Sequence, residues 1–444
     1  MFLTSDQQDT FSGRNGAALL RLAIGAVIFA LMVNTWLIEG LVAPLVVSSG
    51  SMAPALQGPC LHWHCIACGS DFACGRESLP AAHRAAVCPL CGTENDAAAG
   101  LSREGQRVFV DRSAFLWRPP RRFEVVVAQV PDNPRTLCVK RVIGLPGERV
   151  KIAEGEIWNG HEIVRKSPRE QLALGVGLSP RVSNCPADSP AIQWQDPTGH
   201  WRFIDGCYVH AASCEGLRRP GEGAAEAVSS TMDWLVFHPT AAHGRGGGTQ
   251  DRILDESPYD QSESRRLNVV RDIVVCARVA AAGDGELLLA ASAGGDAFEA
   301  CLDLGAHRGC LRHNHRNVSN FDIPSLDSFR PCALEWGMAD HQARLVMQGC
   351  VVLEYRYQPI VTADAGGSRL AIGARDASVK LLELQVFRDV YYISGPGEAE
   401  VARQLGADEY FLLGDNSAHS MDSRHWSPRG GLAGMLIVGK AIGW

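Results

Sequence analysis

Two hydrophobic patterns divide this sequence. Residues 17–38 form one continuous apolar run, AALLRLAIGAVIFALMVNTWLI, whereas short segments in which apolar and polar residues alternate follow Asn268. At 1.5 Å per residue, a helix over the first run would be about 33 Å long, enough to cross the hydrocarbon core of a bilayer. The alternating segments recur at intervals of roughly 8–12 residues, which is typical of an antiparallel β-sandwich. The sequence therefore predicts one N-terminal transmembrane helix and a mainly β remainder.

The basic residues near the apolar run predict its orientation. Arg14 and Arg21 lie on its N-terminal side, and no lysine or arginine occurs from Leu22 to Ala73. Positive residues favour the cytoplasmic side, so we expect a cytoplasmic N-terminus and a single span, because no second long apolar run follows. A cleaved signal peptide is the alternative, but the run is longer than such peptides usually are, which favours an uncleaved anchor.

Six segments between residues 180 and 400 carry the alternating pattern. They are DIVVCARV, GELLLAAS, FEACLDL, CALEWGMA, ARLVMQGCVVLEYRY and ASVKLLELQVFRDVYYI. The phrase ARLVMQGCVVLEY resembles the paired strands of concanavalin A-like jelly rolls, so we expect a jelly-roll-like sandwich after a loop-rich start. Such a sandwich binds carbohydrate or protein, or covers a neighbouring domain; the lack of an Asp/Asn metal cluster in its sequence favours a scaffold, with its ligand unknown.

Composition narrows the class of protein. The chain has 444 residues, enough for two or three domains, and 46% of them are hydrophobic, which excludes a largely disordered protein. The net charge of −7 gives no reason to expect a nucleic acid as partner.

A serine and a lysine far apart in sequence form the main candidate for chemistry. Residues 49–54 read SGSMAP, and residues 139–147 read VKRVIGLPG. A serine hydroxyl needs a base to become a good nucleophile, and a lysine amine is a base only when desolvation lowers its pKa. The chain has only five lysines, so Lys140 among apolar neighbours is unlike casual surface charge; an exposed lysine on an edge strand is the alternative.

A third segment favours Lys140 as a base over Lys140 as an exposed lysine on an edge strand. Residues 410–424 read YFLLGDNSAHSMDSR, a strand pattern that enters a polar Gly-Asp-Asn turn. In this order, SGSMAP, VKRVIGLPGE and GDNSAHSMDSR resemble the motifs of bacterial signal peptidase I, a membrane-bound Ser-Lys protease family. The resemblance covers residues 15–58, 101–170 and 405–444, which is less than half of the chain.

The resemblance implies a role for each matching residue. Ser51 would be the nucleophile and Lys140 the general base, while the Ser49 hydroxyl and the Ser51 amide would form the oxyanion hole. Ser420 would orient the lysine amine, Asp422 and Arg424 would form an ion pair behind the site, and Gly414, Asp415 and Asn416 would form the supporting turn. Ser417 stands where many members of the family have arginine, which affects substrate fit rather than proton transfer.

Two Cys-x-x-Cys pairs follow the nucleophile segment at once. Cys65, Cys68, Cys88 and Cys91 have the spacing of a four-cysteine zinc ribbon, and each pair ends in a glycine as zinc knuckles do. Two disulfides are the alternative, because an exported domain meets an oxidising compartment. The spacing favours one structural zinc, and no cofactor is expected for catalysis.

These inferences predict a signal-peptidase-type antiparallel β core with two inserts. The expected parts are an N-terminus and anchor (1–40), core segments (41–59, 101–179 and 401–444), a zinc-ribbon insert (60–100) and a β-sandwich insert (180–400). The resemblance implies an inner-membrane endopeptidase that removes signal peptides from preproteins on the periplasmic side, with preproteins and membrane lipid as partners. The alternatives are a peptidase specialised for a few partner proteins and a membrane-tethered binding protein that uses the core as a scaffold.

Overall fold

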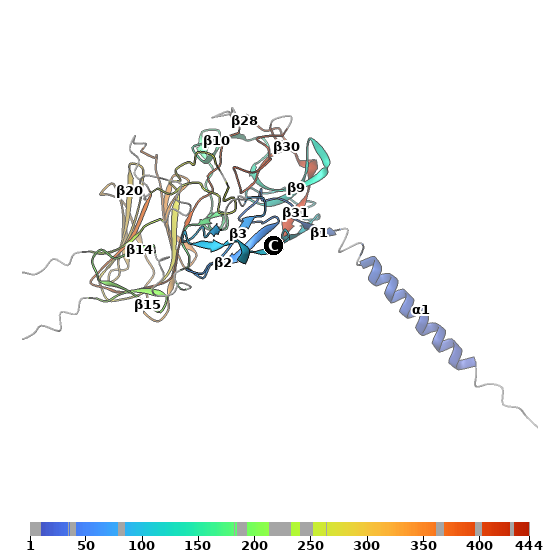
Figure 1. The fold of residues 1–444 in the computed structure, drawn as a ribbon, viewed down its shortest axis with the longest axis horizontal. Coiled ribbons are helices and arrows are strands. Elements are labelled where there is room, and N and C mark those ends of the chain that lie inside the picture. The colour runs from blue at the N-terminus through green and yellow to red at the C-terminus, as the bar shows by residue number, and fades with distance from the viewer. Residues whose placement is uncertain are drawn as a thin grey trace, which may run out of the picture.

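The computed structural model describes residues 10–33, 35, 41–78, 85–181, 183, 193–212, 232–239, 252–262, 264–360, 368–395, 402–426 and 430–443. The chain is mainly β, with α1 (Thr10–Val33) and α2 (Pro168–Leu174) as the α-helices of this part. Helix α1 projects from one end of the β-rich body, and the sandwich strands lie at the other end (Figure 1).

Helix α1 covers most of the apolar run for which the sequence predicts a transmembrane helix. The rest of that run lies partly outside the described residues. Within the described residues, no helix is both long enough and apolar enough to cross a membrane.

A seven-stranded antiparallel sheet forms the core that carries the three sequence motifs. In spatial order its strands are β1 (Val42–Val46), β7 (Arg107–Asp111), β31 (Ile437–Ile442), β8 (Val125–Val130), β9 (Asn133–Gly144), β29 (Glu409–Leu413) and β30 (Leu432–Ala433). A smaller sheet beside it contains β12 (Glu162–Ile163), β11 (Glu156–Asn159), β10 (Arg149–Ala153) and β28 (Arg403–Gln404). Strands from the N-terminal, middle and C-terminal parts of the sequence therefore pair directly, which brings the three sequence motifs together.

The ribbon insert follows the nucleophile segment. It consists of β2 (Cys60–His64), β3 (Asp71–Gly75), β4 (Ala85–Val87), β5 (Glu94–Asp96), the 3₁₀ turn η2 (Ala97–Ala99) and β6 (Leu101–Arg103). Its small core packs the four knuckle cysteines against Trp63 and Phe72, whose rings are stacked 5.4 Å apart.

Two antiparallel sheets form the sandwich insert. The first has the order β15 (Trp201–Ile204), β16 (Cys207–His210), β27 (Ser378–Arg388), β18 (Ile273–Ala282), β23 (Cys332–Ala339), β24 (Gln342–Met347) and β25 (Cys350–Arg356), with β13 (Val176–Gly177) paired to β27. The second has the order β14 (Trp194–Gln195), β17 (Asp233–Phe237), β26 (Arg369–Arg375), β19 (Glu286–Ala293), β20 (Asp296–Asp303), β21 (Arg308–His313) and β22 (Arg316–Asp322). The strands lie where the alternating segments predict them, because their inward side chains form one continuous hydrophobic core between the sheets.

Candidate active site

The nucleophile candidate lies on a tight turn between β1 and β2. The amide of Ala53 donates to the carbonyl of Gly50 at 3.0 Å, and the amide of Leu56 donates to the carbonyl of Met52 at 2.8 Å. The side chains of Met52 and Leu56 are fully buried against valines of β7 and β8. These two apolar anchors fix the turn, and Ser51, directly before Met52, is only partly exposed.

Strand β9 brings Lys140 to this turn. The lysine pairs with Val126 of β8, and its Nζ lies 2.8 Å from Ser51 Oγ. Only 2% of Lys140 is exposed, and burial lowers the pKa of its amine, although nearby Asp422 opposes part of this shift. A neutral amine at hydrogen-bond distance from a hydroxyl can take its proton, which is the requirement for a Ser-Lys dyad.

Ser49 lies on the solvent side of the nucleophile. Its Oγ is 3.4 Å from Ser51 Oγ, and its side chain is exposed. A hydroxyl in this place can donate to negative charge that develops beside Ser51. Its role in an oxyanion hole, together with the Ser51 amide, stays a prediction.

Asp422 and Arg424 lie in contact behind the lysine. Arg424 Nε donates to Asp422 Oδ1 at 2.8 Å and Arg424 Nη2 donates to Oδ2 at 2.7 Å, with both side chains buried. Burial alone would raise the pKa of Asp422, but the hydrogen bonds from Arg424 lower it overall. Arg424 Nη1 also donates to Ser417 Oγ at 2.9 Å, so Ser417 has a structural contact here.

Ser420 and Gly414 pack against the same turn. Ser420 is buried, but among the described residues its hydroxyl makes no hydrogen bond to Lys140. A Cβ added at Gly414 would lie 2.3 Å from both Ser420 Oγ and the Ser51 carbonyl oxygen. Glycine at 414 is therefore required for the close approach of this loop to the nucleophile.

Asp415 and Asn416 support the site through two different partners. Arg141 donates to both carboxylate oxygens of Asp415, at 2.7 Å from Nε and 2.6 Å from Nη2, and both side chains are buried. The Asn416 amide N–H donates to the Ser51 carbonyl at 3.1 Å, and its side-chain amide donates to the Gly50 carbonyl at 3.0 Å. Sequence reasoning did not include Arg141 among the site residues. The available signal was a second basic residue next to Lys140 on an apolar strand. Adjacent strand residues face opposite sides, so the two can have different partners.

The four knuckle cysteines converge in the ribbon. Their Sγ atoms all lie within 4.8 Å of one another, with 3.5 Å between Cys65 and Cys91 and 3.8 Å between Cys68 and Cys88. A tetrahedral zinc with bonds of about 2.3 Å would place its sulfurs about 3.8 Å apart, whereas a disulfide needs about 2.05 Å. The four cysteines are buried free thiols, so their arrangement fits a zinc ion and not a pair of disulfides.

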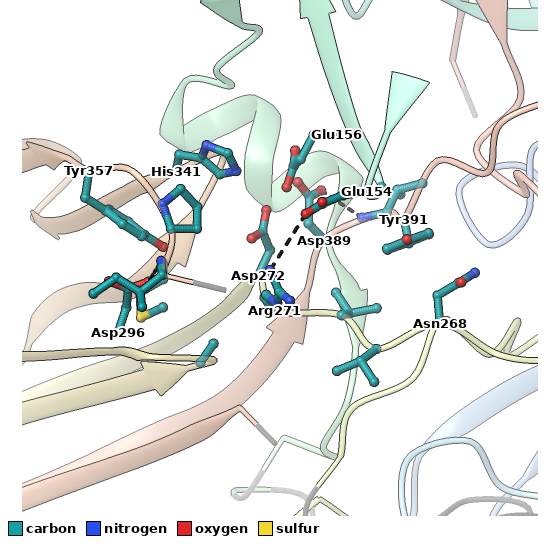
Figure 2. Close-up of a pocket in the computed structure, with 18 of the residues that line it drawn as sticks. Glu154, Glu156, Asn268, Arg271, Asp272, Asp296, His341, Tyr357, Asp389 and Tyr391 are labelled. Atoms are coloured by element: carbon teal, nitrogen blue, oxygen red, sulfur yellow. Dashed lines mark hydrogen bonds and ion pairs between the residues drawn. The ribbon is translucent and has the colours of Figure 1, made fainter. Parts of the chain in front are cut away.

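A second polar cluster lies between the core and the sandwich. Glu156 on β11, Asp272 before β18 and Asp340 after β23 have carboxylate oxygens within 4.8 Å of one another. Glu156, Asp272 and Asp389 line a cavity of about 330 Å³, where Figure 2 shows them converging with Glu154. Burial, and then the charges of Asp389 and Asp340, raise the pKa of Asp272 to about 7. Sequence reasoning missed this cluster because its members come from segments that meet only in the folded chain.

Lys166 already supplies a positive charge to this cluster. Its Nζ is paired with Asp340 and lies 2.7 Å from Asp389 Oδ2, and Asp340 Oδ2 also accepts from the Lys166 amide at 2.8 Å. On the cavity wall, Glu154 faces Arg271 at 3.8 Å. The acidic groups could hold a cation, but these contacts define the cluster as a charged joint between two domains.

Comparison with protein families finds a partial match over the core. A model of the family described as "Signal peptidase, peptidase S26" matches residues 81–173 and 384–443. These segments contain Lys140 and the 414–424 loop, and Ser51 lies before the first of them. Signal peptidase I V of Bacillus subtilis (strain 168) is 28% identical over 76 residues. That match spans 17% of this chain and 44% of that protein, less than half of its length.

Comparison with solved structures finds distant similarities. The carbohydrate binding module CBM66 from Bacillus subtilis is similar with a TM-score of 0.27 and 10% identity, covering 44% of this chain and 95% of its own. The potassium-bound Emp46p carbohydrate recognition domain gives 0.30 and 12% identity, covering 48% and 95%. A Bacillus subtilis protein of unknown function with a galectin-like fold gives 0.29 and 9%, covering 45% and 91%. Scores of this size assign no ligand to the sandwich.

Proposed function

We propose that this protein is a serine endopeptidase that uses Ser51 and Lys140 as a catalytic dyad. The observation that carries the proposal is the 2.8 Å distance between Lys140 Nζ and Ser51 Oγ, with the lysine buried. The match of the flanking core segments to the signal peptidase family supports the same reaction class.

The reaction follows from the donors and acceptors of the site. Lys140 takes the Ser51 proton as Ser51 Oγ attacks the scissile carbonyl carbon, and the carbonyl oxygen becomes an oxyanion. In this proposal the Ser49 hydroxyl and the Ser51 amide donate to that oxyanion. As the C–N bond breaks, the protonated lysine gives its proton to the leaving amine, which leaves a Ser51 ester. Lys140 then removes a proton from water, whose oxygen attacks the ester carbonyl carbon. As the C–Oγ bond breaks, the lysine returns that proton to Ser51 Oγ and the acid product leaves.

The proposed substrates are preproteins with signal peptides, cleaved after small residues such as alanine at the first and third positions before the cut. The family match and the partly matched relative support this substrate class. The proposal places the enzyme at a membrane, where such substrates emerge. Apolar side chains exposed on α1, among them Leu22, Phe29 and Met32, support association with lipid.

The direct test is cleavage of a preprotein by the purified full chain. Wild type should release the signal peptide, and Ser51→Ala should not. Ser48→Ala is the matched control, because Ser48 is an exposed hydroxyl three residues before Ser51 and should leave cleavage unchanged. Cleavage by Ser51→Ala at the wild-type rate would refute the assignment.

We also propose that the ribbon holds one structural zinc on Cys65, Cys68, Cys88 and Cys91. Four thiolates leave no open position, so the ion would stabilise the ribbon and would not take part in peptide hydrolysis. Protein purified without chelator should contain about one zinc per chain, and Cys65→Ser or Cys88→Ser should lose it. Cys350→Ser, which changes an exposed thiol of the sandwich, should keep the metal. A mass that shows disulfides among the four residues, without zinc, would contradict the proposal.

A further inference from the structure

We propose that Asp260, supplied by the sandwich insert, is a positioning residue for the nucleophile turn. Residues 257–261, SPYDQ, form a segment that lies between the ribbon and the Ser51 turn, and we call it the 257–261 clamp. The inference rests on the proposed peptidase function and extends it, because it gives part of the large insert a role in the reaction.

The Asp260 carboxylate binds Asn416, which itself binds the turn that carries Ser51. Asn416 Nδ2 donates to Asp260 Oδ2 at 2.6 Å and to the Gly50 carbonyl at 3.0 Å. The amide N–H of Asn416 donates to the Ser51 carbonyl at 3.1 Å. Asn416 therefore fixes the carbonyl groups on both sides of the Ser51 amide, and Asp260 fixes the Asn416 side chain.

The same carboxylate is tied to the ribbon and to its own segment. Ser78 Oγ, just after β3, donates to Asp260 Oδ1 at 2.6 Å, and Ser257 Oγ donates to Oδ2 at 3.0 Å. With only 7% of Asp260 exposed, water cannot readily replace these bonds. One buried carboxylate thus joins the sandwich insert, the ribbon and the C-terminal loop at the nucleophile.

The neighbours of Asp260 make the clamp rigid. The Tyr259 ring packs on Gly50 so closely that a Cβ there would lie 2.6 Å from it, and the Tyr259 hydroxyl donates to the Pro59 carbonyl at 3.2 Å. The Gln261 side chain bonds both backbone groups of Val87, at 3.0 Å and 2.7 Å. Because Val87 precedes the knuckle residue Cys88, the position of the turn is coupled to the ribbon.

The consequence is a prediction about turnover. Loss of the Asp260 carboxylate leaves the Asn416 amide without one acceptor and frees the turn to shift relative to Lys140. A displacement of about 1 Å in a reacting group costs on the order of a hundredfold in rate. Asp260→Ala should therefore lower kcat by roughly tenfold to a hundredfold and change KM much less, because the residue touches no substrate.

The experiment compares three variants of the full chain in preprotein cleavage. Asp260→Ala should lose turnover, and Asp260→Asn should recover most of it, since an amide oxygen can accept from Asn416 while its NH2 donates to Ser78 Oγ. Asp322→Ala is the matched control, because this aspartate of the same insert has a side chain that is 91% exposed. Zinc content and the unfolding midpoint, measured in parallel, should be unchanged in Asp260→Asn.

Ser78→Ala keeps the inference testable if Asp260→Ala does not fold. Removing this single hydroxyl should lower kcat severalfold. Where Asp260→Ala does fold, adding Ser78→Ala to it should cause no additional loss, because both act through one carboxylate. Wild-type kcat in Ser78→Ala, or equal losses of kcat in Asp260→Ala and Asp260→Asn, would overturn the inference. If wild type cleaves no better than Ser51→Ala, the proposed function fails instead.

Discussion

The molecule buries two of its five lysines, and the two environments have opposite effects. Lys140 is 2% exposed and contacts a serine hydroxyl, and burial lowers the pKa of its amine. Lys166 is 4% exposed and is paired with Asp340 and Asp389. Burial alone would lower the pKa of Lys166 too, but these carboxylates raise it well above its usual value.

The comparison teaches that burial alone does not make a lysine a base. Desolvation disfavours the charged amine at both places, and the immediate partner decides the outcome. At Lys140 the carboxylate that acts most strongly, Asp422, is paired with Arg424, so the amine is free to exchange a proton with Ser51. At Lys166 two carboxylates hold the proton, which makes the residue a structural cation.

The largest expected difference is in catalysis. Lys140→Arg should abolish turnover, with a loss of about a thousandfold or more, because a guanidinium cannot give up its proton near neutral pH. Lys166→Arg keeps the charge at the other site and should still cleave substrate. Initial rates on a preprotein, normalised to folded protein, measure both. Substantial cleavage by Lys140→Arg would show that the two lysines do not differ as described.

A smaller loss is expected for the proposed oxyanion donor. Ser49→Ala removes one hydroxyl beside the nucleophile and should lower kcat by about a hundredfold with little change in KM. Ser49→Thr keeps a hydroxyl and should retain part of the activity. If both variants lose all activity together with their folded structure, Ser49 acts in folding, contrary to this account.

Lys166 should matter for stability instead. Lys166→Met leaves the buried carboxylates of Asp340 and Asp389 without their cation, which should reduce the free energy of unfolding by about 3–5 kcal/mol. Lys380→Met removes an exposed lysine of strand β27 and should change the free energy of unfolding by less than about 0.5 kcal/mol. Denaturant unfolding measures both variants. Equal stability of the two would contradict a structural role for Lys166.

The last expected effect depends on pH and concerns the charged joint. The ordinary pKa of an aspartate is 3.8, and that of Asp272 is about 7 in the folded chain. Its contribution to the free energy of unfolding is therefore full below about pH 4 and is lost as the pH rises through 7. The loss is on the order of 1 kcal/mol per unit of pKa shift. Asp272→Asn, which stays neutral, should therefore stabilise the protein at pH 8 and much less at pH 5. If Asp272→Asn changed the free energy of unfolding equally at pH 5 and pH 8, the result would contradict the raised pKa of Asp272.

Much of the site could be predicted from the sequence because its residues sit in short local motifs. The turn that carries Ser51, the strand that carries Lys140 and the two knuckles each depend on a few neighbouring residues. The sandwich strands could be predicted for the same reason, since alternation with period two is a local pattern. The membrane span stays a prediction; within the described residues no helix is both long and apolar enough to cross a membrane.

The remaining contacts could not be predicted because they join segments far apart in the chain. Asp260 meets Asn416 across 156 residues, and Lys166 meets Asp340 across 174. Nothing near Asp260 in the sequence marks it as a partner of the nucleophile turn. Such pairs are defined only by how the inserts pack on the core.

The most direct test of the central claim is an NMR titration of the lysine side chains. With only five lysines, protein labelled at lysine gives five signals, and the Lys140→Met and Lys166→Met variants assign the two buried ones. We expect the Lys140 amine to titrate well below the ordinary lysine pKa and Lys166 to remain protonated at higher pH than the exposed lysines. A Lys140 signal that titrates with the exposed lysines would contradict the assignment of Lys140 as the general base.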